Sequence, residues 1–107
     1  MNFNHLRAFY EVAKTGSFSA AAKSLFLTQS AVAWQIKNLE EYYELKFFER
    51  TGKKVILTEE GKVLFDFADR IFNLNHQTEG VITDLKESTH SAPRSEARGM
   101  LRVNPFD

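Results

Sequence analysis

Apolar residues near the N-terminus recur with the spacing of amphipathic helices. The first stripe has members three or four positions apart: Leu6, Phe9, Tyr10 and Ala13. Asn4 is placed to cap the start of this helix, and Gly16 lies just past its end, where glycine is favoured. In the next stretch, Ser19 can cap a second helix whose alanines at 20–22 allow close packing against a neighbour.

A third helix is predicted after a gap of about three residues. Thr28 can cap it, and the helix extends over about Gln29–Tyr42. Its buried stripe consists of Val32, Ile36 and Leu39. Two short helices joined in this way fit a helix-turn-helix motif at about 18–37. An ordinary helical hairpin in a small bundle fits the same spacing, so the pattern alone leaves both open.

The pattern then changes from helical to extended. Short runs of β-forming residues flank Gly52, which predicts a hairpin over about 47–57 with Lys53 and Lys54 at its tip. A β-hairpin after three helices makes a winged helix-turn-helix, and a basic tip suits a wing that lies along a phosphate backbone. The alternative is a hairpin whose basic turn is only solvated.

One long helix is predicted to follow the hairpin. Thr58 can cap it, Glu59 and Glu60 lie in its first turn, where the helix dipole favours anions, and the pattern continues to about Glu87. Its seam has heptad spacing with one polar position: Leu64, Phe67, Ile71, Leu74, Thr78, Val81 and Leu85. Other apolar residues widen this face near its start: Phe65, Ala68 and Phe72. We therefore expect the start of the helix to lie on its own domain and the seam to pair with a second copy of the chain.

Length and composition fit one small domain with an appendage. The chain has 107 residues, of which 43% are hydrophobic and 26% charged, and it has no cysteine, which excludes disulfides and cysteine-based metal sites. No apolar run approaches the ~18 residues of a membrane span, so we expect a cytoplasmic protein. The histidines, His5, His76 and His90, share no ligand or catalytic spacing, so we expect neither an enzyme nor a cofactor or metal.

The net charge is zero, which at first argues against a nucleic-acid partner. The charges are nevertheless segregated along the chain. Segments 1–39 and 50–58 each carry +3, whereas segment 40–49 carries −3 and segment 59–87 carries −4. The two positive segments build the short helices and the wing, and the negative charge lies mainly on the end of the third helix and on the long helix. Affinity for DNA should therefore come from a modest number of phosphate contacts on one face.

A set of residues in one register, spread over about residues 3–86, matches a known pattern: Leu6, Phe9, Val12-Ala13, Gly16-Ser17-Phe18, Ala21-Ala22, Leu25, Thr28-Gln29-Ser30-Ala31-Val32, Gln35-Ile36, Leu39-Glu40, Phe48, Arg50, Leu57-Thr58 and Gly61. With these residues the chain resembles the LysR-type transcriptional regulators. The resemblance implies a mainly α fold, in which a winged helix-turn-helix domain of three helices and a β-hairpin (1–58) precedes a linker helix (59–87) that forms a homodimer. It also implies a hinge at 88–107 that leads into an effector-binding domain for a small molecule, with tetramers common among full-length members. We expect the chain to be the DNA-binding fragment of such a regulator.

Helical geometry places five side chains outward on the third helix, opposite its buried stripe: Gln29, Ser30, Ala33, Trp34 and Lys37. Gln29 can pair with adenine, Ser30 can bond a base edge or phosphate, and the Ala33 methyl can meet a thymine methyl. Lys37 is expected at a phosphate. Trp34 either is exposed, to pack on sugars or a thymine methyl, or lies partly in the core.

Further DNA contacts are expected outside the third helix. Thr28, besides capping, can touch a phosphate, and Lys53 and Lys54 are expected on the flanking backbone or in a minor groove. Arg50 either contacts DNA or pairs with an acid such as Glu40 or Glu49 to hold the wing in place. These residues predict a dimer that binds an imperfect palindrome in a promoter or operator, with one recognition helix in the major groove of each half-site.

Two positions depart from the family pattern. Members usually have glycine at the position of Glu44, and a glutamate in a left-handed turn costs on the order of 1 kcal/mol, so we expect that turn to differ. Members also commonly have serine at the position of Ala33, so a contact through that hydroxyl does not carry over. The alternative function is a winged-helix dimerisation module that binds a protein; the polar and basic outward face favours DNA.

Overall fold

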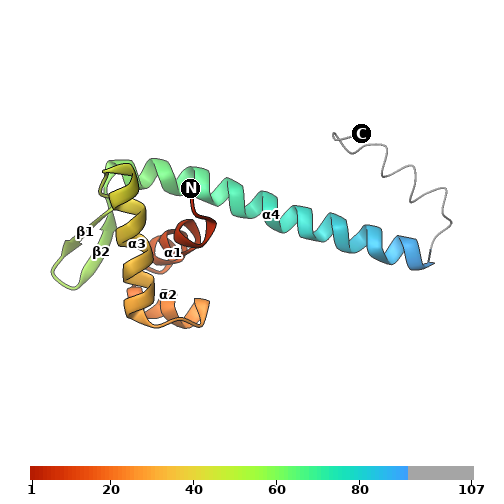
Figure 1. Cartoon of the computed structure of the whole chain (residues 1–107), viewed down its shortest axis with the longest axis horizontal. Helices are drawn as coiled ribbons and strands as arrows, with labels where there is room; N and C mark the ends of the chain where they lie inside the picture. The colour runs from red at the N-terminus through yellow and green to blue at the C-terminus, as the bar shows by residue number, and fades with distance from the viewer. Residues whose placement is uncertain (92–107) are drawn as a thin grey trace. The chain divides into compact units, whose positions relative to one another are not determined.

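The computed structural model describes residues 1–91, which form four helices and one two-stranded sheet (Figure 1). The elements in chain order are α1 (Phe3–Thr15), α2 (Phe18–Leu25), α3 (Gln29–Tyr43), β1 (Phe48–Thr51), β2 (Lys54–Leu57) and α4 (Glu59–Ser91). Residues 1–70, called the head below, form one compact unit, and a second unit begins at Ile71. Of the hinge predicted at 88–107, the part from 92 onwards lies outside the described residues.

The first two helices begin earlier than predicted. Asn2, and not Asn4, caps α1, because its side chain accepts hydrogen bonds from the backbone N–H groups of Asn4 (2.8 Å) and His5 (3.2 Å). Ser17, and not Ser19, caps α2 through a bond from Ala20 N–H at 3.1 Å. In both cases the true cap is the residue with extended backbone just before the helix.

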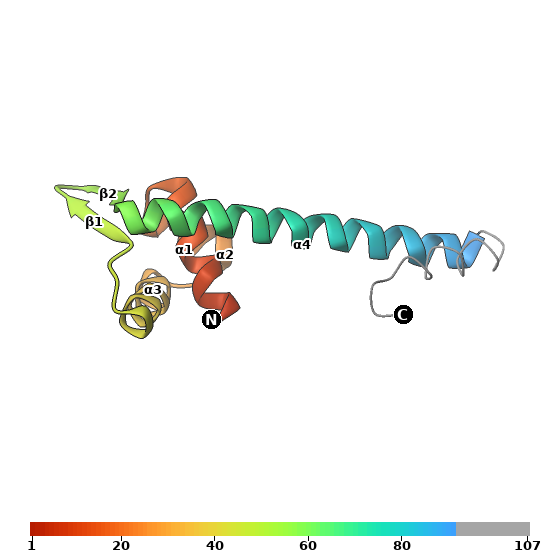
Figure 2. The same cartoon turned by 90° about the horizontal axis from the view of Figure 1, so that it is seen from above.

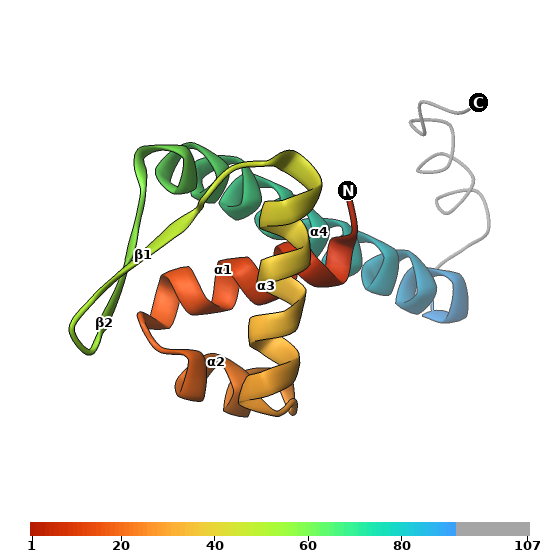
Figure 3. The same cartoon turned by 60° about the vertical axis from the view of Figure 1, so that its left-hand side comes forward.

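The three short helices enclose the core of the head, with α3 crossing α1 and α2 packed near the start of α3 (Figure 3). The core contains three of the four residues of the first predicted stripe, all three of the α3 stripe and two of the alanines of α2: Leu6, Phe9, Tyr10, Ala21, Ala22, Val32, Ile36 and Leu39. Ala13, predicted in the first stripe, is half-buried, whereas Val12 is fully buried. The small alanine side chains let α2 approach its neighbours closely.

Three helices end in a residue with left-handed backbone. Gly16 ends α1 with φ +70°, as predicted. Glu44 ends α3 with φ +54°, so the expectation that this turn would differ is wrong. The turn persists because Leu45 N–H still reaches the carbonyl of Glu40 (3.1 Å), which satisfies a free end of the helix. Phe26 ends α2 in the same way, with φ +57° and a side chain that is 95% exposed.

The hairpin is antiparallel and projects from the helical part of the head (Figure 2). Its register pairs Phe48 with Leu57 and Thr51 with Lys54. Gly52 takes φ +62° in the two-residue turn, a conformation that glycine adopts without strain. The predicted wing is therefore confirmed, and its first strand begins at Phe48, one residue later than predicted.

Thr58 joins the base of the hairpin to the first turn of α4. Its hydroxyl donates to the carbonyl of Lys46 (2.6 Å) and accepts from Gly61 N–H (3.0 Å), which confirms it as a helix cap. Its own N–H donates to the carbonyl of Phe47 at 3.1 Å. Gly61 is buried at this junction, where a Cβ atom would overlap the Phe47 carbonyl oxygen.

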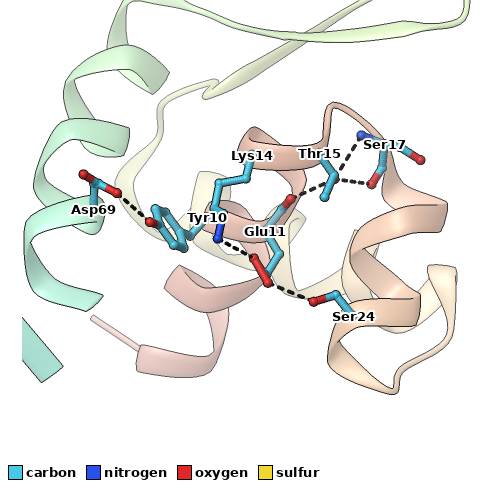
Figure 4. A network of polar contacts seen from close by, with 7 residues as sticks. All are labelled: Tyr10, Glu11, Lys14, Thr15, Ser17, Ser24 and Asp69. Atoms are coloured by element: carbon cyan, nitrogen blue, oxygen red, sulfur yellow. Dashed lines mark hydrogen bonds and ion pairs between the residues drawn. The ribbon is translucent and has the colours of Figure 1, made fainter. Parts of the chain in front are cut away.

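A polar network fastens α1 to its neighbours within the head (Figure 4). The hydroxyl of Tyr10, a residue that is only 7% exposed, donates to the Asp69 carboxylate at 2.5 Å. This hydrogen bond, together with burial and the nearby carboxylate charge, raises the pKa of Tyr10 to about 12. The Glu11 carboxylate accepts from the Ser24 hydroxyl at 3.0 Å, a bond that links α1 to α2. It also forms an ion pair with Lys14 of α1 at 3.7 Å.

The α4 helix extends to Ser91, beyond the predicted end at about Glu87. Ser, Thr and His are mediocre helix formers, but adding residues to an existing helix costs little, and the sequence has no proline before Pro93. Within the head, Ala68 is buried and the Phe65 ring stacks on Tyr10 at 5.3 Å, as expected for the widened face.

Candidate nucleic-acid interface

The outward face of α3 begins at its N-terminus. Thr28 caps the helix by accepting from Ala31 N–H at 3.0 Å. Because Val32, Ile36 and Leu39 are buried, the opposite face is presented to solvent, and the predicted readers on it are exposed: Gln29, Ser30, Trp34 and Lys37. Ala33 is half-buried at the edge of this face. The predicted orientation of the helix is therefore confirmed.

Trp34 is exposed to 61% and so is not a core residue. Its ring meets the His5 ring edge-on, with centroids 5.9 Å apart, and its backbone carbonyl accepts from the Asn38 side chain at 2.7 Å. The sequence left the exposed and partly buried alternatives open, and the structure selects the exposed one. A large amphipathic ring held at this place can pack against sugars or methyl groups.

The wing presents cations near its tip. Lys53 lies in the turn and Lys54 begins β2, and both side chains are exposed. Ion pairs among residues 1–91 involve Lys14, Lys46 and Lys62, so neither wing lysine is neutralised within this range. Their charge is available to a polyanion.

Arg50 makes neither of the ion pairs considered for it. Its guanidinium carbon lies 4.6 Å above the centre of the Phe18 ring, and it has no ion pair within residues 1–91. The Glu40 carboxylate instead accepts from the N–H groups of Phe47 (2.8 Å) and Phe48 (3.3 Å) and lies 3.8 Å from Lys46. The alternative in which Arg50 pairs with an acid to hold the wing is therefore wrong. The Glu40 carboxylate instead holds the start of the wing by accepting hydrogen bonds from its backbone N–H groups.

A hollow of about 320 Å³ lies between α3 and the base of the wing. Cations on its rim come from three different segments: Lys37, Lys46 and Arg50. Ala33, at the edge of the outward face of α3, lines the same hollow, so the hollow adjoins that face. Sequence reasoning missed Phe18 and Lys46. Phe18 belongs to the Gly16-Ser17-Phe18 signature, but that pattern does not show which side chain the ring meets.

A metal-binding cluster and a membrane-spanning helix are both absent from the described residues. No three histidine or acidic side chains that the structure describes gather so that they could hold a metal ion. Nor does the described part of the chain contain a helix that is long and apolar enough to cross a membrane.

Residues 3–62 match the family described as "Bacterial regulatory helix-turn-helix protein, lysR family". The chain belongs to the LysR family. The fold agrees: with a TM-score of 0.75 and 30% identity, the chain is similar to the crystal structure of the BenM DNA-binding domain in complex with catB site 1 DNA, and the match covers 80% of this chain and 96% of that one. LysR-family DNA-binding domains thus share the three helices and hairpin described above.

Curated relatives of this LysR-family chain are transcriptional regulators. It is 40% identical over 83 residues to the probable RuBisCO transcriptional regulator of Guillardia theta, a match that covers 78% of this chain and 27% of that protein. It is 39% identical over 101 residues to the glycine cleavage system transcriptional activator of Escherichia coli, covering 94% of this chain and 30% of that protein. The chain thus spans less than a third of the length of these relatives.

Proposed function

We propose that this chain is the DNA-binding part of a LysR-type transcription regulator and binds promoter or operator DNA as a dimer. The observation that carries the proposal is the outward face of α3, where polar and basic side chains are exposed beside wing lysines that form no ion pair with any described residue. A face with exposed basic side chains and a helix that can enter a major groove fits duplex DNA. The DNA complex of the similar BenM domain supports the same function.

Each exposed side chain has a role in this proposal. Gln29 and Ser30, at the start of α3, read base edges, and Ala33 and Trp34 meet thymine methyl groups or sugars. Lys37 and the Thr28 hydroxyl contact phosphates. Arg50, Lys53 and Lys54 bind the backbone beside the major groove, and the wing tip reaches a minor groove.

Fluorescence anisotropy with a random-sequence duplex of about 30 base pairs tests DNA binding directly. Each head offers about four cations, so a dimer should lose about 10³-fold to 10⁵-fold in affinity between about 50 and 200 mM salt. A protein-binding module would show no such salt-dependent binding to duplex, and that result would reject the proposal. Selection of bound duplexes from a random pool would then return the half-site sequence and spacing.

The dimer is proposed to form through α4. From Ile71 onwards its seam is exposed at several large apolar positions, among them Leu74 at 64%, although Leu85 is half-buried. Within the head, Leu64 and Phe67 of the same seam line an apolar groove of about 340 Å³. Thr78 is the polar position of the seam, and its hydroxyl donates a hydrogen bond to the Leu74 carbonyl at 2.7 Å. Pairing of the seam would therefore not bury an unsatisfied donor at Thr78.

Leu74→Lys places a charge in this seam, whereas Asn73→Lys adds the same charge one residue away, outside it. Analytical ultracentrifugation should show a dimer for the parent chain and for Asn73→Lys, and a shift towards monomer for Leu74→Lys. A monomeric parent chain, alone and on DNA, would refute dimerisation through α4. Binding of a small-molecule effector and higher assembly are proposed only for a full-length regulator, through a domain beyond this chain.

A further inference from the structure

Phe18 and Arg50 come from different elements but meet beside the outward face of α3. Phe18 is the first residue of α2, and Arg50 lies in β1. The guanidinium carbon of Arg50 stands 4.6 Å from the centre of the Phe18 ring, close enough for attraction between the cation and the negative face of the ring. Through this contact the wing meets α2.

The Phe18 ring is itself held in place. It is half-buried, and it meets the Phe48 ring edge-on with centroids 6.4 Å apart. The turn before it is fixed, because Ser17 caps α2 through a bond from Ala20 N–H at 3.1 Å. A ring fixed in this way forms a platform that restricts the long, flexible arginine side chain.

The contact leaves the hydrogen-bonding edge of Arg50 available. An aromatic ring interacts with the flat face of a guanidinium, so the N–H donors around its edge stay free, whereas a carboxylate partner would occupy two of them and cancel the charge. Glu40, the acid on the rim of the hollow, is occupied by Phe47 N–H (2.8 Å) and Phe48 N–H (3.3 Å). Arg50 therefore keeps its charge and its donors.

The place of Arg50 suggests what it binds. It lines the hollow of about 320 Å³ together with Lys37 and Lys46, and Ala33 of the outward face of α3 lines the same hollow. A duplex whose major groove received α3 would bring a backbone phosphate to this rim. A phosphate oxygen is the acceptor that a guanidinium edge fits best.

We propose that Phe18 is a positioning residue, which holds the Arg50 guanidinium ready to bind one DNA phosphate between α3 and the wing. The inference rests on the proposed function. By restricting Arg50 before DNA arrives, the ring reduces the side-chain entropy lost on binding. Phe18 acts through Arg50 and does not touch the DNA.

The test is a double-mutant cycle on the complete chain with a random-sequence duplex, measured by fluorescence anisotropy. Arg50→Ala should lower affinity about 10-fold per head of the dimer, because each head loses one charge-assisted contact. Phe18→Leu, which keeps an apolar side chain, should lower affinity about 3-fold to 5-fold per head. In the Arg50→Ala background the same Phe18→Leu change should have almost no effect. Phe18→Tyr, which keeps the aromatic ring, should bind like the parent chain.

Two further measurements keep the test decisive. The Arg50 side-chain Nε–H resonance should be shifted upfield by the Phe18 ring and should move when Phe18→Leu removes it. Thermal unfolding shows whether each variant is still folded. If Phe18→Leu is unfolded, the affinity of Phe18→Tyr relative to the parent chain and the position of the Arg50 resonance in the parent chain test the inference instead.

An equal loss from Phe18→Leu in both backgrounds would overturn the inference, since it would show a purely structural role. Unchanged binding by Arg50→Ala, or an Arg50 resonance without an upfield shift, would overturn it as well. In each of these cases the parent chain still binds DNA in a salt-dependent way, so the proposed function survives. Absence of any duplex binding by the parent chain would instead refute the proposed function.

Discussion

Replacing Gly61 by alanine perturbs the junction between the wing and α4. A Cβ atom at this position would overlap the carbonyl oxygen of Phe47 and stand 3.0 Å from Leu57 Cδ2. The obstacle is backbone, which is tied to Thr58 N–H at 3.1 Å and cannot rotate away as a side chain would. Either the hairpin base or the first turn of α4 must move.

The size of the effect follows from two opposing terms. Alanine in a helix is favoured over glycine by about 1 kcal/mol, whereas overpacking against a fixed neighbour costs about 1–3 kcal/mol and sometimes more. Because the overlap is with backbone, we take the upper end of the overpacking cost, about 3 kcal/mol. Subtracting the gain of about 1 kcal/mol from helix propensity, we expect Gly61→Ala to lower the free energy of unfolding by about 2 kcal/mol. Gly80, in the same helix, has nothing within 4 Å of a Cβ, so Gly80→Ala should instead raise stability by about 1 kcal/mol.

Urea unfolding followed by far-UV circular dichroism measures both changes. All variants must be compared at one protein concentration, because dimerisation stabilises the folded state by mass action. A Gly61→Ala variant as stable as Gly80→Ala would refute the reasoning, since it would show that helix propensity alone decides at position 61.

Four other substitutions probe three separate features. Glu44→Gly should stabilise the chain by about 1 kcal/mol in the same urea assay, because φ is +54° there; a destabilised variant would show that the Glu44 side chain contributes more than the strain costs. Tyr10→Phe should cost about 1–2 kcal/mol at about pH 8, because Asp69 loses a hydrogen-bond donor. Since the pKa of Tyr10 is raised to about 12, its contribution to the free energy of unfolding is complete below pH ~10 and falls as the pH rises towards 12. The difference in stability between the parent chain and Tyr10→Phe should therefore narrow by about 1 kcal/mol at about pH 11. A difference that does not change with pH would contradict the raised pKa. In anisotropy titrations Lys53→Ala should weaken binding to all duplexes and reduce the salt slope by about 1 per head, whereas Gln29→Ala should relax sequence preference; equal losses on selected and random duplexes for both variants would argue against these roles.

The helices and the wing could be predicted because their signals are local and repeated. Val32, Ile36 and Leu39 fix the buried side of α3, and that side determines which residues face outward. The helix starts were less accurate, because a serine at 17 and a serine at 19 are both acceptable caps by residue type. Backbone geometry decides between them, and it selects Ser17.

Two further features were beyond prediction from the sequence. The left-handed Phe26 has a residue type that rarely adopts this backbone, and its conformation follows from how α2 must turn into α3. Arg50 on Phe18 joins residues far apart in the sequence, and the sequence left open whether Arg50 contacts DNA or pairs with an acid such as Glu40, whose carboxylate instead accepts from Phe47 N–H. Long-range side-chain contacts of this kind depend on the packed fold and leave no periodic signal.

The direct passage from α1 into α2 has a consequence for how the head folds. Gly16 ends one helix and Ser17 caps the next, so only two residues connect them. Closing such a short connection loses little chain entropy, whereas joining the wing to α1 requires a much longer loop to close. We therefore expect contacts between α1 and α2 to be largely formed in the folding transition state, with φ-values at Val12 and Ala22 higher than at Val55 in the wing.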